Sequence, residues 1–253
     1  MGRLFSFLYG TIAYVLFLGT FLYLIGFVGD LLVPKGVGSG PATAASLWSA
    51  VLIDVGLIGL FAVQHTIMAR PSFKAWWTQI VPPALERSTF VVATCAVFAL
   101  MFWQWQPLTA VVWSVESQAL RYALLALFGC GWALVLVSTF VIDHFDLFGL
   151  RQSLTHAFGR EYHKPRFRES SLYRAVRHPL MLGMVIAFWA APDMSLGRFV
   201  FAVTYTVYIV AAIRIEERDL IAAHGAAYEE YRRRVPALLP LRPLLPRPVR
   251  SRG

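Results

Sequence analysis

The fold of this chain is decided by long apolar runs, the first of which is residues Phe5–Val28, FSFLYGTIAYVLFLGTFLYLIGFV, without one charged side chain. A helix of that length crosses a hydrocarbon core of roughly 30 Å. Three similar runs follow, at about Leu47–Met68, Thr89–Trp105 and Leu120–Ile142. Two shorter runs, Leu180–Ala191 and Phe199–Ile213, are marginal spans. They form either two crossings or a helical hairpin that dips into the bilayer.

The composition indicates the same class of protein. Of 253 residues, 58% are hydrophobic and only 15% are charged, whereas a soluble domain carries roughly 25% charged residues. The mean hydropathy is +0.60. Such continuous apolar runs exclude a disordered chain and a transmembrane barrel. We therefore predict an all-α fold, a polytopic transmembrane helical bundle with five to six membrane helices.

Positive charge is concentrated in the second half of the chain. Residues 1–143 hold 6 basic and 5 acidic side chains, a net of +1, and residues 144–253 hold 17 and 9, a net of +8. Basic residues beside apolar spans are an orientation signal, so this excess does not require a nucleic-acid partner. With both termini cytoplasmic, only Lys35, Arg121 and Arg198 fall near the other face. We expect an inner-membrane protein in that orientation.

The titratable residues favour a site at the cytoplasmic interface. All six histidines fall near that face in the predicted topology, and no HExxH motif or matched His/Cys spacing predicts a metal site. Cys95 and Cys130 lie inside apolar runs and are expected to be packing residues. Asp54 is the clear carboxylate within a span, and we interpret it as a helix-packing group before a proton relay.

The sharpest local motif is Tyr173–Gly183, YRAVRHPLMLG. Pro179 stands where a helix is expected to start, because the first turn does not need its missing N–H. Gly183 permits close approach one turn later. The free amides at that helix start favour an anion such as a carboxylate. The alternative is an ordinary basic flank before a membrane span.

A second motif follows the last apolar run. It begins with Arg214–Leu220, RIEERDL, and continues through His224-Gly225, Tyr228, Tyr231 and Val235-Pro236. The paired carboxylates of this motif are suited to a ribose diol or an amino group. They are equally suited to i,i+4 ion pairs with neighbouring arginines on a solvated helix.

Together these motifs resemble the isoprenylcysteine carboxyl methyltransferase superfamily, whose pattern is Arg-His-Pro-x-Tyr-x-Gly, then Glu-Glu and a Tyr/Tyr/Pro tail. The resemblance covers about residues 171–240 and implies S-adenosyl-L-methionine as methyl donor. The cofactor-binding residues that it implies are Tyr173, Arg177, His178, Pro179, Gly183, Glu216, Glu217, Tyr228 and His163. Met181 replaces the Tyr of the pattern, which weakens the case for a prenylcysteine substrate, and His224-Gly225 stands where Phe-Gly is usual.

A narrower resemblance runs nearly end to end. It is carried by Phe27–Asp30, Val33–Lys35, Gln64–Arg70, Phe73–Trp77, Glu86–Thr89 and Ile142–Leu150. These segments are similar to the bacterial methanethiol S-methyltransferases, and also to NnrU-like membrane proteins. The resemblance implies methylation of methanethiol to dimethyl sulfide, with a small thiol and membrane lipids as partners and no required protein partner. The alternatives are a prenylcysteine or lipid methyltransferase and a non-enzymatic NnrU-like protein.

A thiol nucleophile needs a base near neutral pH, because free thiols ionise only at higher pH. We predict that His144 takes the thiol proton and that Asp143 orients its ring. Because neighbouring residues do not share a helical face, Asp146 or a distant carboxylate is the alternative orienting group. His65 and Arg70 are second choices on the thiol side. The competing interpretation of Asp143-His144 is an interfacial helix cap with a solvated histidine.

These expectations divide one integral membrane domain, residues 1–253, into three parts. Residues 1–142 form a four-helix transmembrane part. Residues 143–240 form the cofactor-binding part, which contains a cytoplasmic loop region, the helical hairpin and a C-terminal helix. Residues 241–253 form a basic Pro/Arg tail.

Overall fold

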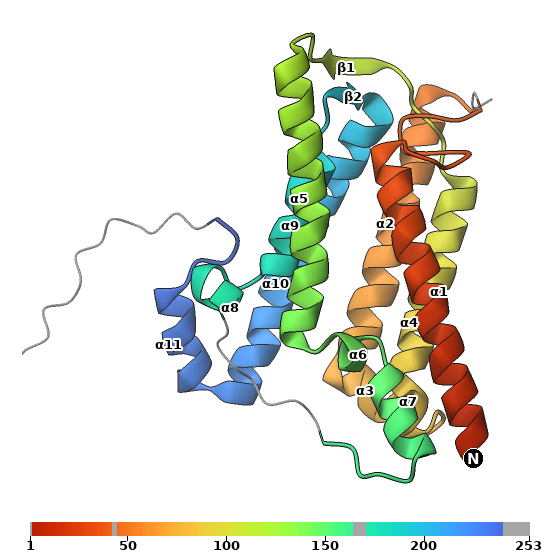
Figure 1. The fold of residues 1–253 in the computed structure, drawn as a ribbon, viewed down its shortest axis with the longest axis vertical. Helices are drawn as coiled ribbons and strands as arrows, with labels where there is room; N and C mark the ends of the chain where they lie inside the picture. The colour runs from red at the N-terminus through yellow and green to blue at the C-terminus, as the bar shows by residue number, and fades with distance from the viewer. Residues whose placement is uncertain (1, 42–44, 164–170, 240–253) are drawn as a thin grey trace, which may run out of the picture.

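The computed structural model describes residues 2–41, 45–163 and 171–239, so the tail 241–253 lies outside the described residues. It confirms the all-α, polytopic prediction, with five helices long and apolar enough to cross a membrane (Figure 1). These helices are α1 (Arg3–Gly29), α2 (Leu47–Ala69), α4 (Pro83–Gln104), α5 (Gln118–Ile142) and α10 (Leu196–His224).

The last two apolar runs differ in what they become. The first is α9 (Pro179–Trp189), 11 residues long and too short to cross. The second is part of α10, which continues 11 residues beyond Ile213, where the apolar run ends. The added part includes the charged segment RIEERDL, which is also helical. The hairpin is therefore asymmetric, and its long arm carries the paired glutamates beyond the apolar run.

The short elements lie at the two ends of the bundle (Figure 1). In the half that holds the N-terminus are α3 (Pro71–Trp77), α6 (His144–Leu147), α7 (Leu150–Ala157), α8 (Ser171–Ala175) and α11 (Ala226–Arg234). At the opposite end, β1 (Val111–Ser114) and β2 (Asp193–Ser195) form an antiparallel pair that the sequence did not predict.

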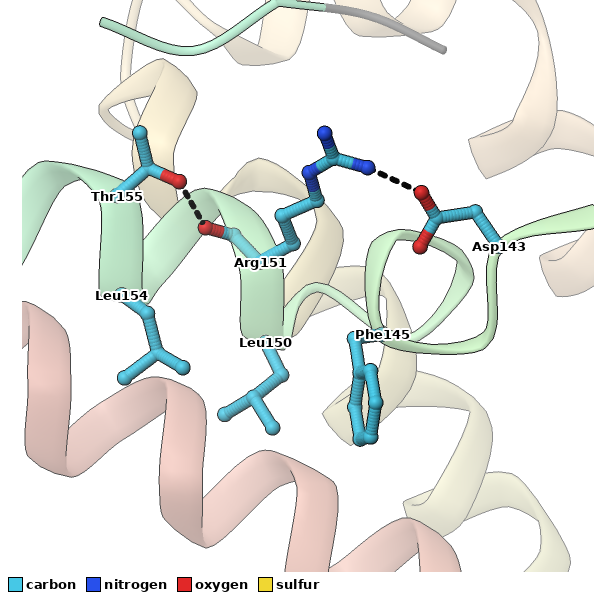
Figure 2. Close-up of a pocket in the computed structure, with 6 residues that line it drawn as sticks. All are labelled: Asp143, Phe145, Leu150, Arg151, Leu154 and Thr155. Atoms are coloured by element: carbon cyan, nitrogen blue, oxygen red, sulfur yellow. Dashed lines mark hydrogen bonds and ion pairs between the residues drawn. The ribbon is translucent and has the colours of Figure 1, made fainter. Parts of the chain in front are cut away.

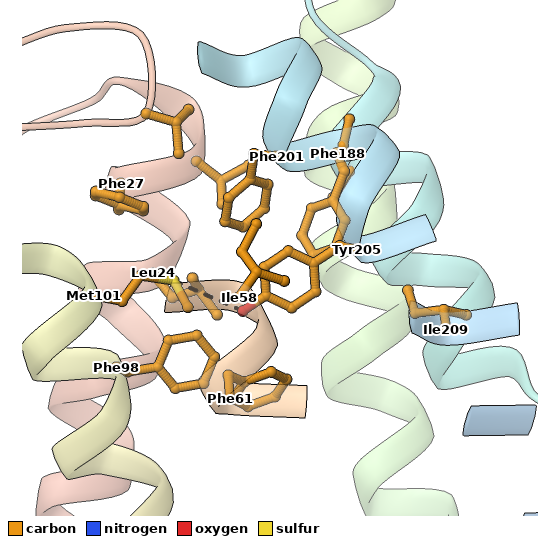
Figure 3. Packing of buried hydrophobic residues seen from close by; sticks show 14 of the residues in the cluster. Leu24, Phe27, Ile58, Phe61, Phe98, Met101, Phe188, Phe201, Tyr205 and Ile209 are labelled. Atoms are coloured by element: carbon orange, nitrogen blue, oxygen red, sulfur yellow. Dashed lines mark hydrogen bonds between the residues drawn. The ribbon is translucent and has the colours of Figure 1, made fainter. Parts of the chain in front are cut away.

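The core is strongly aromatic (Figure 3). Phe61 of α2 contacts Phe98 of α4, with ring centroids 4.8 Å apart, and lies 5.6 Å from Tyr205 of α10. Aromatic pairs of this kind contribute about 0.5–1.5 kcal/mol beyond area burial. Elsewhere in the bundle, α5 packs closely on α9. A Cβ at Gly183 would lie only 2.7 Å from the Gly131 carbonyl oxygen, so this close approach depends on the glycine.

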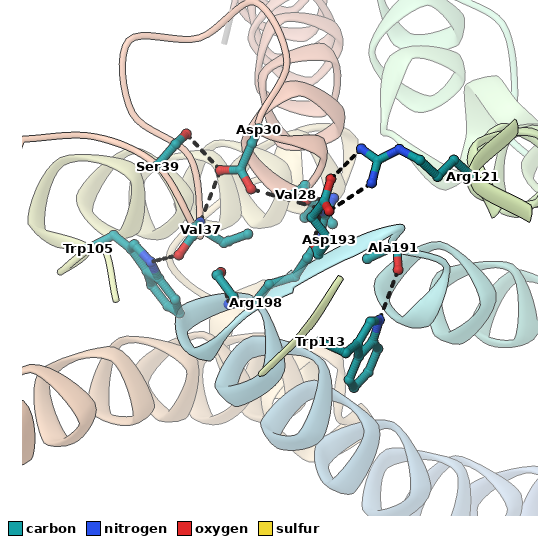
Figure 4. A network of polar contacts seen from close by, with 12 residues as sticks. Val28, Asp30, Val37, Ser39, Trp105, Trp113, Arg121, Ala191, Asp193 and Arg198 are labelled. Atoms are coloured by element: carbon teal, nitrogen blue, oxygen red, sulfur yellow. Dashed lines mark hydrogen bonds and ion pairs between the residues drawn. The ribbon is translucent and has the colours of Figure 1, made fainter. Parts of the chain in front are cut away.

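A polar network closes the end of the bundle that carries β1 and β2 (Figure 4). Arg121 pairs with Asp193 through two nitrogens, at 2.9 and 2.6 Å. The buried Arg198 donates to the Val28 carbonyl and lies 3.9 Å from Asp30. Two of the three basic residues expected at this face are thus neutralised by local partners.

The segment between α1 and α2 is partly buried where it is described, at residues 30–41 and 45–46. Val37 is fully buried, and its carbonyl accepts from the Trp105 indole at 3.1 Å. Asp30 accepts from the Gly38 amide at 3.0 Å and from the Ser39 hydroxyl at 2.8 Å. This segment folds back on the bundle because these bonds satisfy its backbone.

Candidate active site

The two motifs of the C-terminal half meet in space. Pro179 begins α9, which places Arg177 and His178 directly before the helix, beside the extended end of α10. Arg177 Nε and a terminal guanidinium nitrogen lie 2.7 and 2.6 Å from Glu217 Oε1. His178 Nε2 lies 3.1 Å from the same oxygen. The Glu217 side chain is only 10% exposed, so its charge is held by these two neighbours.

Arg177 and His178 also fix the C-terminal segment. Arg177 donates to the carbonyls of Arg232, at 3.0 Å, and Val235. The amides of Arg177 and His178 donate to the carbonyls of Pro236 and Ala237 at 2.9 and 3.1 Å. The end of α11 is thereby attached to the start of α9.

Three further cofactor candidates surround this centre. Glu216 Oε2 is 3.6 Å from His178 Nδ1, and its side chain is 49% exposed, in contrast to Glu217. Tyr228 is buried, and burial together with the Glu217 charge raises its pKa to about 12. The Tyr173 carbonyl accepts from the Tyr231 hydroxyl at 2.7 Å, and burial raises the pKa of Tyr173 as well. Glu216 is thus the more accessible carboxylate of the pair.

The remaining cofactor candidates have other surroundings. Gly183 faces the backbone of α5, so the close approach that it permits is between two helices. Pro179 is buried at the first position of α9. His163 is exposed after α7 and lies directly before residues that are not described.

His144 occupies a buried aromatic cage. Its Nδ1 is 2.7 Å from Thr139 Oγ1, and its Nε2 is 2.8 Å from the Tyr14 hydroxyl. Thr139 Oγ1 donates to the Leu136 carbonyl, so we assign the proton to Nδ1 and the acceptor role to Nε2. The ring stacks on Phe140 at 4.2 Å, and burial lowers the pKa of His144. Both ring nitrogens are therefore engaged, and the expectation of a solvated histidine is wrong.

Neither expected aspartate orients His144. Asp143 Oδ1 accepts from the Asp146 amide at 3.2 Å, which caps α6, and Asp143 Oδ2 pairs with Arg151. Asp146 Oδ1 accepts from the Tyr162 hydroxyl at 2.8 Å, and burial raises the pKa of Asp146. The orienting group is Thr139, which lies one helical turn before the histidine. The adjacent carboxylates point elsewhere because consecutive residues do not share a face.

A pocket of about 430 Å³ includes Asp143 and Phe145, the two chain neighbours of His144, in its lining (Figure 2). It is lined by Asp143, Phe145, Leu150, Arg151, Leu154 and Thr155. Leu150 and Leu154 point toward α1, and the Phe145 ring lies 5.4 Å from the His144 ring. The two leucines of LRQSLTHA are spaced i,i+4, which predicts an apolar face on this short helix. That spacing is the sequence signal from which the pocket lining could have been found.

The second-choice thiol residues lie on α2 and at its end. His65 lies between Phe61 and Phe90, with ring centroids 5.0 and 4.9 Å away. Its buried Nδ1 has no hydrogen-bond partner within the described part of the chain. Arg70 is 2.8 Å from Asp219 of α10, so it ties the α2–α3 junction to the glutamate-bearing helix. Across the described ranges, no three His, Cys, Asp or Glu side chains form a group that could hold a metal.

Fold and site define the chain as a polytopic helical membrane protein in which a buried Arg177–Glu217 pair, contacted by His178, joins the two C-terminal motifs. It is 50% identical over 240 residues to methanethiol S-methyltransferase of Mycobacterium tuberculosis, which covers 95% of this chain and 98% of that protein. The Crocosphaera subtropica protein of the same name is 46% identical, covering 95% of this chain and 93% of its own. The chain belongs to the methanethiol S-methyltransferase family and is a methyltransferase.

A more distant relative is Nurim of Mus musculus, 28% identical over 183 residues, or 69% of this chain and 70% of Nurim. No family model and no solved structure matches the chain.

Proposed function

We propose that this protein transfers the methyl group of S-adenosyl-L-methionine to methanethiol, giving dimethyl sulfide. The observation that carries the proposal is the 50% identity to a protein named for that substrate, spread over 98% of its length. The meeting of the Arg177-His178-Pro179 turn with Glu216 and Glu217 supports it, because the superfamily resemblance assigns the methyl donor to these two motifs.

The donor set at this centre matches the chemistry of the methyl donor, which carries an ammonium, a carboxylate and a ribose diol. Glu216, half exposed beside His178, suits the ammonium or the diol. The start of α9 has no side-chain cap, so its first amides are suited to the carboxylate. We propose that Glu216, His178 and Tyr228 contact the donor and that Arg177 and Glu217 position them. When bound, the sulfonium supplies an electrophilic methyl carbon.

The chain contributes mainly by positioning and by excluding water. Arg177 and His178 fix the buried Glu217, and Tyr228 is buried as well, so the half-exposed Glu216 is presented from a rigid base. Holding two reactants in line is worth up to about 7–11 kcal/mol of the barrier. The thiolate and sulfonium charges neutralise each other during the transfer, so a site with little water suits this reaction.

We further propose that this site faces the cytoplasm from the bacterial inner membrane, with both termini cytoplasmic. The half of the bundle that holds the N-terminus contains α3, α7 and α11 (Figure 1), and these helices carry Lys74, Arg151 and the run Arg232–Arg234. The opposite end holds Lys35, Arg121 and Arg198, two of which are paired with aspartates. The excess of positive charge at the site end is typical of the cytoplasmic side.

The test uses membranes that contain the full-length protein. Radiolabelled S-adenosyl-L-methionine and methanethiol should give labelled dimethyl sulfide in the headspace, and calorimetry on purified protein should detect donor binding. Glu216→Gln should weaken donor binding about tenfold or more, because a charged contact is lost. The exposed Glu161 supplies the control, since Glu161→Gln should change neither quantity.

Two outcomes would contradict the proposal. Donor binding without any volatile product at saturating thiol, but with methylated lipid or prenylcysteine, would assign the protein to the alternative membrane methyltransferases. Absence of donor binding would favour a non-enzymatic protein.

A further inference from the structure

Seven buried side-chain nitrogen or oxygen atoms have no hydrogen-bond partner among the described residues, and one of them is His65 Nδ1 on α2. His65 Nδ1 is inaccessible, and no donor or acceptor among the described residues reaches it. Buried polar atoms are nearly always satisfied, so an unsatisfied one near a candidate active site points to a missing ligand. The walls around this nitrogen indicate which ligand it is.

The surroundings of His65 are apolar rings and one cation. Phe61, one turn earlier on α2, stacks on the imidazole at 5.0 Å with an interplanar angle of 26°, and Phe90 of α4 lies 4.9 Å away. The Arg87 guanidinium lies 4.9 Å from the centre of the same Phe90 ring. Tyr205 and Tyr208 of α10 face Phe61 from the third side. A small apolar molecule with one acidic hydrogen suits such a place.

His65 also lies on the helix that is joined to the carboxylate-bearing helix. Thr66, the next residue, is within 3.3 Å of the Tyr208 hydroxyl, and Arg70 pairs with Asp219 one turn further on. Glu216 lies between Tyr208 and Asp219 along α10. These two contacts hold the His65 region of α2 against the same helix that carries the proposed donor contacts.

A proton acceptor needs a ring nitrogen that is not already hydrogen-bonded, and His144 has none. Its Nε2 already accepts from Tyr14, and its Nδ1 already donates to Thr139. A thiol would have to displace the Tyr14 hydroxyl to reach Nε2. At His65 Nδ1 no hydrogen bond to another described residue has to be broken.

We infer that His65 Nδ1 is the group that accepts the proton of the substrate thiol, with the Arg87 charge stabilising the thiolate. This inference rests on the proposed function and names its general base. The S–H proton passes to Nδ1 while its electron pair remains on sulfur. That pair forms the new S–CH₃ bond, and the bond from the methyl to the sulfonium of S-adenosyl-L-methionine breaks with its pair staying on the donor sulfur. The products are a thioether, a neutral demethylated donor and a protonated imidazole that returns its proton to water.

The test compares two thiols of similar size, ethanethiol and the more acidic 2,2,2-trifluoroethanethiol. A thiol that is already ionised does not need a base, so His65→Asn should lower kcat/KM about 100-fold for ethanethiol but less than about tenfold for trifluoroethanethiol. His156, an exposed histidine at the end of α7, supplies the control: His156→Gln should behave as wild type with both thiols. A merely structural role for His65 would lower both rates equally, which would overturn the inference.

A second measurement does not depend on turnover. In protein labelled with ¹⁵N-histidine and held in micelles without methyl donor, ethanethiol should shift one Nδ1 resonance, and that resonance should be missing in His65→Asn. If ethanethiol moves no histidine resonance, or moves only one that persists in His65→Asn, the inference is wrong. If wild type forms no thioether from either thiol, the proposed function fails instead. Calorimetric donor binding and a melting temperature near that of wild type would show that His65→Asn is folded.

Discussion

His144 illustrates how a buried hydrogen-bond network fixes the state of one residue. Thr139 and Tyr14 occupy both ring nitrogens, and Phe17, Phe140 and Phe148 surround the ring. Protonation would add a second N–H where the Tyr14 hydroxyl now donates, and it would place a charge among aromatic rings. Burial accordingly lowers the pKa of His144, and the neutral tautomer is part of the folded state.

This network predicts a pH dependence of stability. Because the folded-state pKa of His144 lies below the ordinary value near 6.5, the unfolded chain binds more protons as the pH falls below that value. Stability should therefore be greatest above about pH 6.5 and decrease as the pH is lowered toward about 5.5. In thermal denaturation in detergent, the melting temperature should decrease less with falling pH for His144→Asn than for wild type. Equal pH slopes for the two proteins would contradict the prediction.

At the scale of the elements, the docking of the C-terminal helix α11 depends on one arginine, Arg177. Arg177 contacts Glu217 on α10 and the carbonyls of Arg232 and Val235 at the end of α11. Tyr228 and Tyr231 of α11 pack against each other, with ring centroids 5.7 Å apart, over this cluster. One side chain therefore connects the start of α9, the end of α10 and the end of α11.

Arg177→Lys should release α11 although it conserves the charge. A lysine ammonium cannot reach all the acceptors that the guanidinium reaches, so we expect a loss of roughly 2 kcal/mol in the docking of α11. Hydrogen exchange should become faster in the α11 amides while the amides of α5 keep their protection. Arg174, exposed on α8, supplies the matched control through Arg174→Lys. Unchanged exchange in α11 would mean that the helix is held by its tyrosines alone.

At the scale of the whole molecule, the two ends of the bundle have different electrostatic character. At the strand end, Asp193 pairs with Arg121, which lowers the pKa of Asp193 to about 2. Asp30 and Arg198 lie beside them, so this end is close to internally neutral. The site end instead carries the unbalanced arginines of the loops and of α11.

Cysteine labelling tests the orientation that this asymmetry predicts. Variants are made without Cys95 and Cys130, with Glu116→Cys at the strand end or Glu161→Cys at the site end, both at exposed positions. A membrane-impermeant maleimide should label the first variant in intact cells and the second only after permeabilisation. The reverse pattern would place the site outside the cytoplasm and would contradict the proposed localisation.

The sequence by itself determined the membrane class, the approximate spans and the two C-terminal motifs. It could do so because a membrane span is recognised from a single continuous stretch of sequence. An apolar run either is long enough to cross the hydrocarbon core or is not. Pro179 and the charged segment after Ile213 are also local signals, and α9 begins at that proline. Val111, Val112 and Trp113 are residues that strands favour, but the pairing of β1 with β2 joins loops far apart in the chain, which no local pattern predicts.

Only the tertiary structure decided which side chains meet. Tyr14 and His144 are 130 residues apart, and Arg70 and Asp219 are 149 apart. No local pattern encodes such contacts, because they depend on how whole helices pack and rotate against one another. From the sequence we predicted Asp143 as the partner of His144, because the two residues are adjacent in the chain. Helix packing brought Tyr14 to the ring instead, and within the described part of the chain it left the Nδ1 of His65 without a hydrogen-bond partner.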